Sequence, residues 1–194
     1  MKRIRGLLNQ VFYKCVTYWV YTFENLQLGQ NVVFKLMPQI LRHNDAKISI
    51  GNGCIINSSN YGYHINMFSK CKLYADRPYA SIEIGENTRI HGTCIHAYNK
   101  IQIGKNCLIA ANTNIIDGNA HELSMENPQN RINTADGGKP IIIEDNVWIA
   151  ANCIILGGSK IGSGAIITAG SVVKGTVPPK SIFGGNPAIL LKLY

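Results

Sequence analysis

The chain has 194 residues, of which 46% are hydrophobic and 15% are charged, and its formal net charge is +8. This length predicts one domain, and the positive charge favours anionic partners such as phosphate groups, a membrane surface or an acidic glycan, unless it serves solubility alone. No run of lysine and arginine contains interleaved aromatic residues, so nucleic-acid binding is not expected.

Residues 1–28 are predicted to form a helical capping segment. Lys2, Arg3 and Arg5 precede an amphipathic run of apolar and aromatic residues. Polar residues such as Lys14 interrupt this run too early for a signal sequence or a transmembrane span. Two interpretations stay open: the helix covers the end of the domain that follows, or residues 1–25 make a peripheral contact with a membrane.

Isoleucine or valine recurs every six residues from Ile143 to Val173, and shorter runs with the same period lie upstream; six is neither the helical nor the strand period. This period is typical of a parallel β-helix, whose short strands stack into coils of about three hexads. We therefore expect residues 29–194 to form one solenoid with interior ladders of these anchor side chains. The anchors are Ile50, Ile56, Ile84, Ile90, Ile103, Ile109, Ile115, Ile143, Ile149, Ile155, Ile161, Ile167 and Val173.

Small residues lie four places after most anchors, as a tight turn between flat faces requires. Cys54, Cys94, Cys107 and Cys153 take this position, and we interpret them as small buried hydrophobic residues. Glycine directly follows several anchors, as at Gly104, where a missing Cβ is expected to ease the turn. The absence of a CxxC pair and of a secretory signal favours a reducing cytoplasmic location, with the inner face of the membrane as a variant of it.

The repeat breaks at residues 117–140, a polar segment that is expected to leave the coil as a loop. Long loops on a rigid repeat often bind a ligand. His121 lies where the next anchor is due and is the first candidate for catalysis. His91 and His96 form a second candidate cluster one coil earlier, and the spacing allows contact with His121 within one chain or across a subunit interface.

Two segments carry a specific motif: DGNAHEL, and residues 144–188, which read EDNVWIAANCIILGGSKIGSGAIITAGSVVKGTVPPKSIFGGNPA. With them the chain resembles the hexapeptide-repeat acyltransferases, in the branch of galactoside, maltose and polysaccharide O-acetyltransferases. The resemblance implies an all-β, left-handed parallel β-helix that forms a homotrimer with active sites between subunits. It also implies transfer of an acetyl group from acetyl-CoA to a hydroxyl of a saccharide acceptor, in surface polysaccharide biosynthesis, without a metal.

The same resemblance implies roles for individual residues. His121 matches the general base that deprotonates the acceptor hydroxyl, a task that suits imidazole because it exchanges a proton near neutral pH. Asp117, Glu122 or a main-chain carbonyl is expected to orient it. The residues expected to contact the acceptor are His91, His96, Asp117, Asn119 and Arg131. Those expected to contact acetyl-CoA, including the tail 178–194, are Trp148, Ala151, Ala169, Ser171, Lys174, Gly185, Asn186, Pro187 and Lys192.

Three other functions are compatible with these residues. The same base would assist N-acetylation of an amino sugar, and the solenoid would also serve as a non-catalytic scaffold. A third is a zinc enzyme like the γ-class carbonic anhydrases, because His91 and His96 have the separation of that family's paired ligands. The other histidines do not complete its ligand spacing, since His64 and His43 precede His91 by 27 and 48 residues.

Overall fold

The computed structural model describes residues 2–194, with side chains from Gly6 onward. The side chains of Lys2, Arg3 and Arg5, which were predicted to flank the N-terminal helix, lie outside the described residues. The elements in chain order are α1 Lys2–Phe23, β1 Gln27–Leu28, β2 Val33–Lys35, β3 Gln39–Arg42, β4 Lys47–Ile50, β5 Ile55–Asn57, β6 Lys72–Ala75, β7 Ser81–Ile84, β8 Arg89–His91, β9 Cys94–His96, β10 Lys100–Ile103, β11 Leu108–Ile109, β12 Asn114–Ile116, η1 Pro128–Asn133, β13 Ile141–Ile143, β14 Trp148–Ile149, β15 Ile154–Leu156, β16 Lys160–Ile161, β17 Ile166–Ile167, β18 Val172–Val173, β19 Thr176–Val177, β20 Ser181–Gly185 and β21 Ala188–Leu193.

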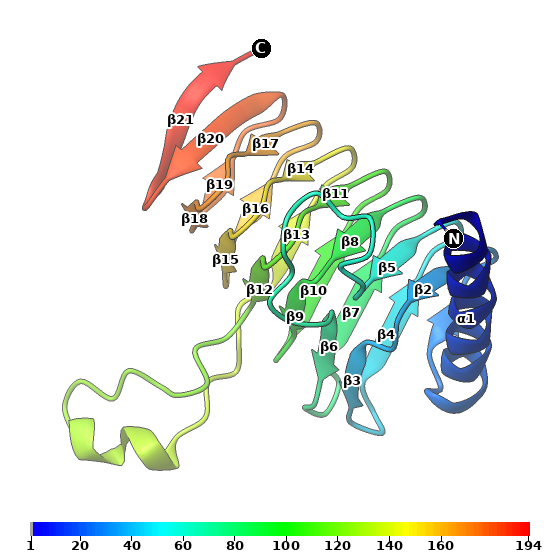
Figure 1. Cartoon of the computed structure of the whole chain (residues 1–194). Coiled ribbons are helices and arrows are strands. Elements are labelled where there is room, and N and C mark those ends of the chain that lie inside the picture. The colour runs from blue at the N-terminus through cyan, green and yellow to red at the C-terminus, as the bar shows by residue number, and fades with distance from the viewer. Residues whose placement is uncertain (1) are drawn as a thin grey trace.

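The strands form three parallel sheets that enclose a single core, which is the architecture of a left-handed parallel β-helix (Figure 1). Face A has the order β1-β4-β7-β10-β13-β16-β19, and face C has the order β18-β15-β12-β9-β6-β3. Face B runs β2-β5-β8-β11-β14-β17-β20 and ends in the antiparallel strand β21. The fold class predicted from the six-residue period is confirmed.

The predicted anchors point into the core. On face A, for example, Ile84 pairs in register with Ile103, and Ile103 pairs with Ile143. Every predicted anchor is at most 4% exposed. Burying one such isoleucine stabilises the fold by roughly 1.5–3 kcal/mol. Stacking of identical side chains on successive coils therefore explains why the sequence keeps so strict a period.

The turns are made differently from the prediction. Many of the positive φ angles that close them fall on asparagines, including Asn87 at 57°, Asn106 at 55° and Asn146 at 60°, and others fall on glycines such as Gly164 at 70°. Gly104 has no such angle; a Cβ there would lie 2.7 Å from the backbone nitrogen of Asp145 on the next coil. Glycine after an anchor is thus needed for the close approach of coils, while asparagine tolerates the left-handed conformation.

One cysteine was placed wrongly. Cys54, Cys107 and Cys153 are buried as predicted, but Cys94 is half-buried at the start of β9. The reason is a hexad shortened by one residue, in which Thr93 is fully buried at the turn position and Ile95 is the next anchor. All six cysteines are free thiols.

A second excursion, residues 58–71, leaves the solenoid between β5 and β6, which the sequence did not predict (Figure 1). The side chain of Asn60 closes it by accepting a hydrogen bond from the Met67 backbone nitrogen at 2.6 Å and donating one to the Met67 carbonyl at 3.1 Å. Its root is tied by Ser58, whose hydroxyl accepts a hydrogen bond from the Cys71 backbone nitrogen at 3.0 Å.

The N-terminal helix packs beside β2, where Val16 and Val20 join the core of the first coils (Figure 1). The helix ends at Phe23, and Gln27–Leu28 is strand β1, which pairs with β4. Its outer face exposes large apolar residues, among them Leu7, Leu8, Val11, Phe12, Trp19 and Phe23. Within residues 2–194, no helix has the length and apolar character needed to cross a membrane.

Candidate active site

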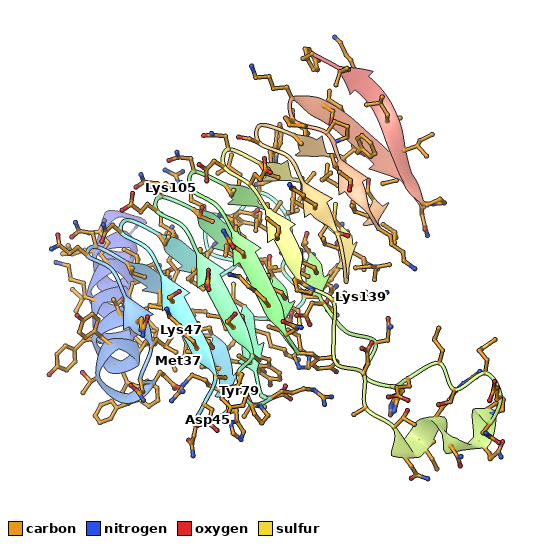
Figure 2. The ribbon with its side chains drawn as sticks, turned by 180° about the vertical axis from the view of Figure 1, so that it is seen from behind. Met37, Asp45, Lys47, Tyr79, Lys105 and Lys139 are labelled. Carbon is orange, nitrogen blue, oxygen red and sulfur yellow. The ribbon has the colours of Figure 1, made fainter. Side chains whose placement is uncertain are left out.

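The loop of residues 117–140 projects from the solenoid between β12 and β13 and carries η1 at its far end (Figure 2). Its boundaries agree with the predicted break in the repeat. The flanking strands stay in the helix, since β12 pairs with β9 and β15, and β13 pairs with β10 and β16. A rigid coil on each side therefore fixes both ends of the loop.

Asp117 locks the root of this loop. Its side chain is 1% exposed, and its carboxylate accepts hydrogen bonds from the backbone nitrogens of Tyr98 at 2.6 Å and Asn99 at 2.9 Å. Burial raises the pKa of this carboxyl, while the backbone donors oppose the shift. Because both oxygens are held inside the protein, we assign Asp117 a structural role in place of the expected acceptor contact.

His121 is exposed on the loop and does not occupy an interior anchor position. Its Nδ1 atom lies 3.2 Å from the main-chain oxygen of Thr134. A carbonyl oxygen only accepts, so Nδ1 carries a proton, and in the neutral ring the lone pair is on Nε2. Thr134 is itself held, because its hydroxyl donates to the Arg131 carbonyl at 3.0 Å and accepts from the Glu122 backbone nitrogen at 3.0 Å.

Two other predicted contact residues shape the loop. The backbone nitrogen of Asn119 donates to the Asp136 carboxylate at 2.8 Å, and the guanidinium Nε of Arg131 donates to the Leu123 carbonyl at 2.7 Å. Backbone hydrogen bonds from Gly138 and Asn119 lower the pKa of Asp136. Asn119 and Arg131 thus each make hydrogen bonds within the loop that carries His121.

His91 ends strand β8 in a half-buried cluster. The amide Nδ2 of Asn57 lies 3.1 Å from Nδ1 of His91, and the Asn57 Oδ1 accepts from the Ser59 backbone nitrogen at 2.9 Å, which fixes the amide orientation. Asn57 therefore donates to Nδ1, and the neutral ring carries its proton on Nε2. The ring of Tyr63 stacks on His91 at 4.5 Å.

The environment keeps His91 uncharged. Burial is the largest cause, and the positive charges of Lys35 and Arg89, with a further contribution from His64, add to it; together they lower the pKa of His91 to about 4. At neutral pH the ring is therefore a hydrogen-bond donor through Nε2 and not a base. Sequence reasoning missed Asn57 and Tyr63, because the register of the coils and the loop of residues 58–71 bring them to His91.

His96 lies on another face, in β9, and its Nε2 is 3.0 Å from the Asp76 carboxylate. The ring of Tyr98 meets it edge-on at 4.6 Å. Among the described residues, no hydrogen bond or ring contact joins His121 to His91 or His96. The three predicted histidines are thus not brought together within one chain.

The residues expected to bind acetyl-CoA line the C-terminal coils. Trp148, in β14, is 49% exposed and stands in register between Leu108 and Ile166 on the outside of face B. Ala151 and Ala169 lie on successive turns of one edge, joined by the hydrogen bond from the Gly170 nitrogen to the Ala151 oxygen at 2.9 Å. Lys174, Gly185, Asn186, Pro187 and Lys192 are exposed on the last coil and the hairpin that follows it.

Ser171 differs from this group. It is fully buried, and its hydroxyl donates to the Thr168 carbonyl at 2.6 Å and accepts from the Gly185 backbone nitrogen at 3.2 Å. We therefore assign it to the interior of a turn, where it ties the start of the GNPA segment to the solenoid.

The ammonium of Lys192 lies 4.2 Å from the ring centroid of Tyr194.

A metal centre does not form within the described part of one chain. No group of three or more histidine, cysteine, aspartate or glutamate side chains from residues 2–194 is arranged to hold an ion. His91 and His96 belong to different faces, B and C. The alternative of a carbonic anhydrase-like zinc site therefore has no support within one subunit.

The chain is similar in sequence and fold to known proteins. The family "Bacterial transferase hexapeptide (six repeats)" matches residues 140–175. WbbJ of Escherichia coli K12, provisionally named a lipopolysaccharide biosynthesis O-acetyl transferase, is 26% identical over 156 residues, which are 78% of this chain and 74% of that protein. A maltose O-acetyltransferase from Clostridium difficile 630 is 26% identical with a TM-score of 0.54, over 96% of this chain and 87% of that chain.

A hexapeptide-repeat acetyltransferase from Vibrio cholerae O1 biovar eltor, solved in complex with acetyl-CoA, is 31% identical with a TM-score of 0.53. The match covers 63% of each chain, so it spans less than two thirds of the Vibrio protein. The repeat, the three-faced solenoid and the named relatives together lead to one conclusion. The chain carries the hexapeptide repeat of the bacterial transferases and is similar to hexapeptide-repeat acetyltransferases.

Proposed function

We propose that this protein transfers an acetyl group from acetyl-CoA to a hydroxyl of a saccharide acceptor, in the biosynthesis of a surface polysaccharide, with His121 as the general base. The observation that carries the proposal is the 3.2 Å contact between His121 Nδ1 and the Thr134 oxygen. In the neutral ring this contact places the proton on Nδ1 and the lone pair on Nε2, and the side chain is exposed. This is the arrangement that a base needs when its substrate arrives from solvent.

The reaction follows from this tautomer. Nε2 of His121 removes the proton of the acceptor hydroxyl while the hydroxyl oxygen attacks the thioester carbon. The tetrahedral intermediate then expels the CoA thiolate, which takes the proton from the imidazolium. The products are the acetyl ester and CoA with a free thiol, and backbone N–H groups of a neighbouring coil are the expected donors to the oxyanion.

His91 is assigned to the acceptor in a different role. Nδ1 of His91 accepts a hydrogen bond from the Asn57 amide at 3.1 Å, so only the proton on Nε2 is available to a ligand. A neutral donor of this kind holds a sugar hydroxyl through its oxygen without removing the proton. His91 thus positions the acceptor, and His96, Asn119 and Arg131 remain candidates for further acceptor contacts.

The proposed acetyl-CoA site is the C-terminal edge of the solenoid. The exposed indole of Trp148 and the small side chains of Ala151 and Ala169 supply the shape of this surface. Lys174 and Lys192 supply positive charge for phosphates, and Gly185, Asn186 and Pro187 form the adjacent turn. The Vibrio cholerae relative was solved with acetyl-CoA, which supports the choice of this donor.

A homotrimer is part of the proposal. Within one chain the loop base His121 makes no contact with the histidines of faces B and C, so the loop of one subunit is expected to serve the groove of another.

The outer face of α1, where Leu7 and Leu8 are each 64% exposed, supports a peripheral contact with the inner face of a membrane in the cytoplasm.

The test is release of free thiol from acetyl-CoA by the purified protein with free sugars, amino sugars and nucleotide sugars. His121→Ala is expected to lower the rate roughly 10²- to 10⁴-fold, with the oligomeric state unchanged. His43→Ala is the matched control, since the side chain of His43 lies at a turn outside the loop and accepts from the Asp45 nitrogen at 3.2 Å. Full activity in His121→Ala would contradict the assignment of His121 as the general base. A product acetylated on an amine would show N-acetylation instead of O-acetylation.

A further inference from the structure

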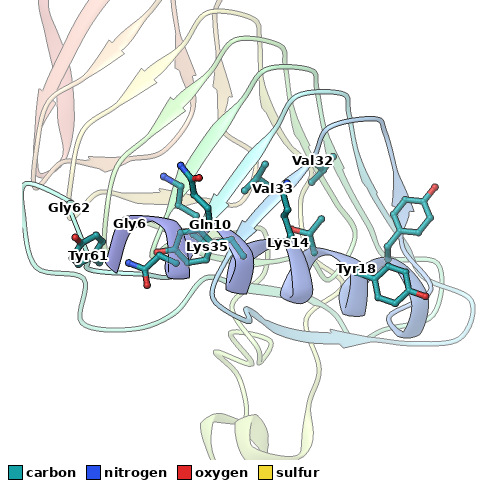
Figure 3. A pocket seen from close by; sticks show the side chains of 13 residues that line it. Gly6, Gln10, Lys14, Tyr18, Val32, Val33, Lys35, Tyr61 and Gly62 are labelled. Carbon is teal, nitrogen blue, oxygen red and sulfur yellow. The ribbon is translucent and has the colours of Figure 1, made fainter. Parts of the chain in front are cut away.

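A cavity at the N-terminal end of the solenoid lies away from both the loop of His121 and the C-terminal coils. It has a volume of about 810 Å³ and lies between α1, β2 and the loop of residues 58–71 (Figure 3). Nothing in the proposed acetyl transfer uses it. Its lining includes four tyrosines and two lysines: Tyr13, Lys14, Tyr18, Tyr21, Lys35 and Tyr61.

The walls of the cavity are fixed to the solenoid. The backbone nitrogen of Phe34, in β2, donates to the hydroxyl of Thr17 in α1 at 3.0 Å. The hydroxyl of Tyr13 donates to Ser59 at 3.3 Å and so joins α1 to the loop of residues 58–71. The helix, the strand and the loop are therefore held in place around the cavity, which is a preformed pocket.

The charge of the cavity is positive and uncompensated within its walls. Lys14 comes from α1 and Lys35 from β2, and no lining residue is acidic. The five ion pairs found among the described residues place carboxylates with other partners and include neither lysine. Two lysines and four tyrosines in the lining of one cavity match a phosphate group attached to a ring or chain.

The positive potential extends to the next coils. Lys35, Asn57 and His91 occupy register-matched positions on β2, β5 and β8 of face B. The charge of Lys35 is the first cause after burial of the lowered pKa of His91. An anion bound at Lys35 would reduce this effect, so His91 reports on the occupancy of the cavity.

We infer that the cavity between α1 and face B binds a phosphodiester-bearing ligand, with Lys14 and Lys35 on the phosphoryl oxygens and the tyrosine rings against the attached ring or chain. Two sources carry this chemistry: a soluble diphosphate-linked sugar, and the headgroup of an anionic phospholipid. The inference does not depend on acetyl transfer.

Calorimetry in the absence of acetyl-CoA tests the site, with uridine diphosphate glucose as the soluble probe and uridine plus glucose as the uncharged control. Lys14→Gln and Lys35→Gln are each expected to weaken binding about threefold, and the double variant about tenfold. Lys47→Gln, on face A, and Lys174→Gln, in the proposed acetyl-CoA site, are expected to bind as the wild type does. Sedimentation with phosphatidylglycerol and phosphatidylcholine vesicles tests the lipid source with the same variants.

Loss of binding in the double variant to the soluble probe, to phosphatidylglycerol vesicles or to both supports the site and identifies the source. Equal binding of both probes by wild type and double variant, or no binding of either, overturns the inference. A second readout is the NMR titration of the His91 ring, whose pKa is expected to rise when the probe that binds is present. An unchanged His91 titration at saturation would place the ligand elsewhere. Thiol release from acetyl-CoA is also measured for Lys14→Gln, so that a loss of ligand binding in the cavity is distinguished from a failure of the acetyltransferase proposal.

Discussion

Asn57 donates its amide hydrogen to Nδ1 of His91 across two adjacent coils, at a distance of 3.1 Å. The pair is held in register by the parallel strands β5 and β8. This single contact decides which nitrogen of His91 faces a ligand, and it separates the chemistry of His91 from that of His121, whose Nδ1 is a donor to the Thr134 carbonyl.

The first prediction concerns pH. The pKa of His91 is about 4 in the folded protein and ordinary in the unfolded chain, so between these values the unfolded state binds the extra proton. The contribution of His91 to the free energy of unfolding is fully present above about pH 6.5 and is lost as pH falls towards 4. Burial, Lys35, Arg89 and His64 cause the shift, and the ring of Tyr63 packs on the same side chain.

Urea unfolding at pH 7 and at pH 4.5 measures this effect. After allowance for solvent screening of a half-buried group, we expect His91→Gln to remove about 1–2 kcal/mol of the acid-induced loss in the free energy of unfolding. His43→Gln, at an exposed turn, is the control. Identical acid sensitivity in wild type and His91→Gln would contradict the assignment of a neutral buried ring.

The second prediction concerns the root of the loop of residues 117–140. Asp117→Asn places an amide where the carboxylate accepts the backbone nitrogens of Tyr98 and Asn99, so one N–H group faces another. The free energy of unfolding should fall by about 1–3 kcal/mol, and the rate of thiol release should fall with it. Asp45→Asn, on an exposed turn, should change neither quantity; a stable and fully active Asp117→Asn variant would refute the structural role.

The third prediction concerns the spacing of coils. A Cβ at Gly104 would lie 2.7 Å from the backbone nitrogen of Asp145 and 2.7 Å from the backbone carbonyl carbon of Glu144. Gly104→Ala is therefore expected to destabilise the protein by about 1–3 kcal/mol or more in thermal or urea unfolding. Gly137→Ala is the matched control, because nothing lies within 4 Å of its added Cβ. Equal stability of the two variants would show that the coils separate without cost.

The fourth prediction concerns the donor site. Lys174→Gln removes an exposed positive charge from the proposed phosphate contacts of acetyl-CoA. The KM for acetyl-CoA should rise about two- to fivefold with kcat little changed, because an exposed ion pair contributes roughly 0.5–1 kcal/mol. Lys47→Gln should leave KM unaltered. A fall in kcat at constant KM would instead place Lys174 at the reacting atoms.

The candidate site was predictable where it depends on local pattern. The break in the six-residue period located the loop of residues 117–140 and singled out His121. The sequence also proposed a main-chain carbonyl as one partner of this histidine, but it did not choose among the alternatives. Asp117 and Ser171 were expected to contact ligands and are buried, because hydrogen bonds to distant backbone groups hold them inside.

By itself the sequence determined the three-faced solenoid, because only branched apolar side chains at every sixth position fill the narrow interior of such a coil. Only the tertiary structure decided which side chains contact one another on the outer faces of the solenoid. The excursion of residues 58–71, the alignment of Lys35, Asn57 and His91, and the cavity beneath α1 depend on which coils and segments lie side by side. A period of six residues repeats equally along the chain and holds no information about those contacts between distant segments.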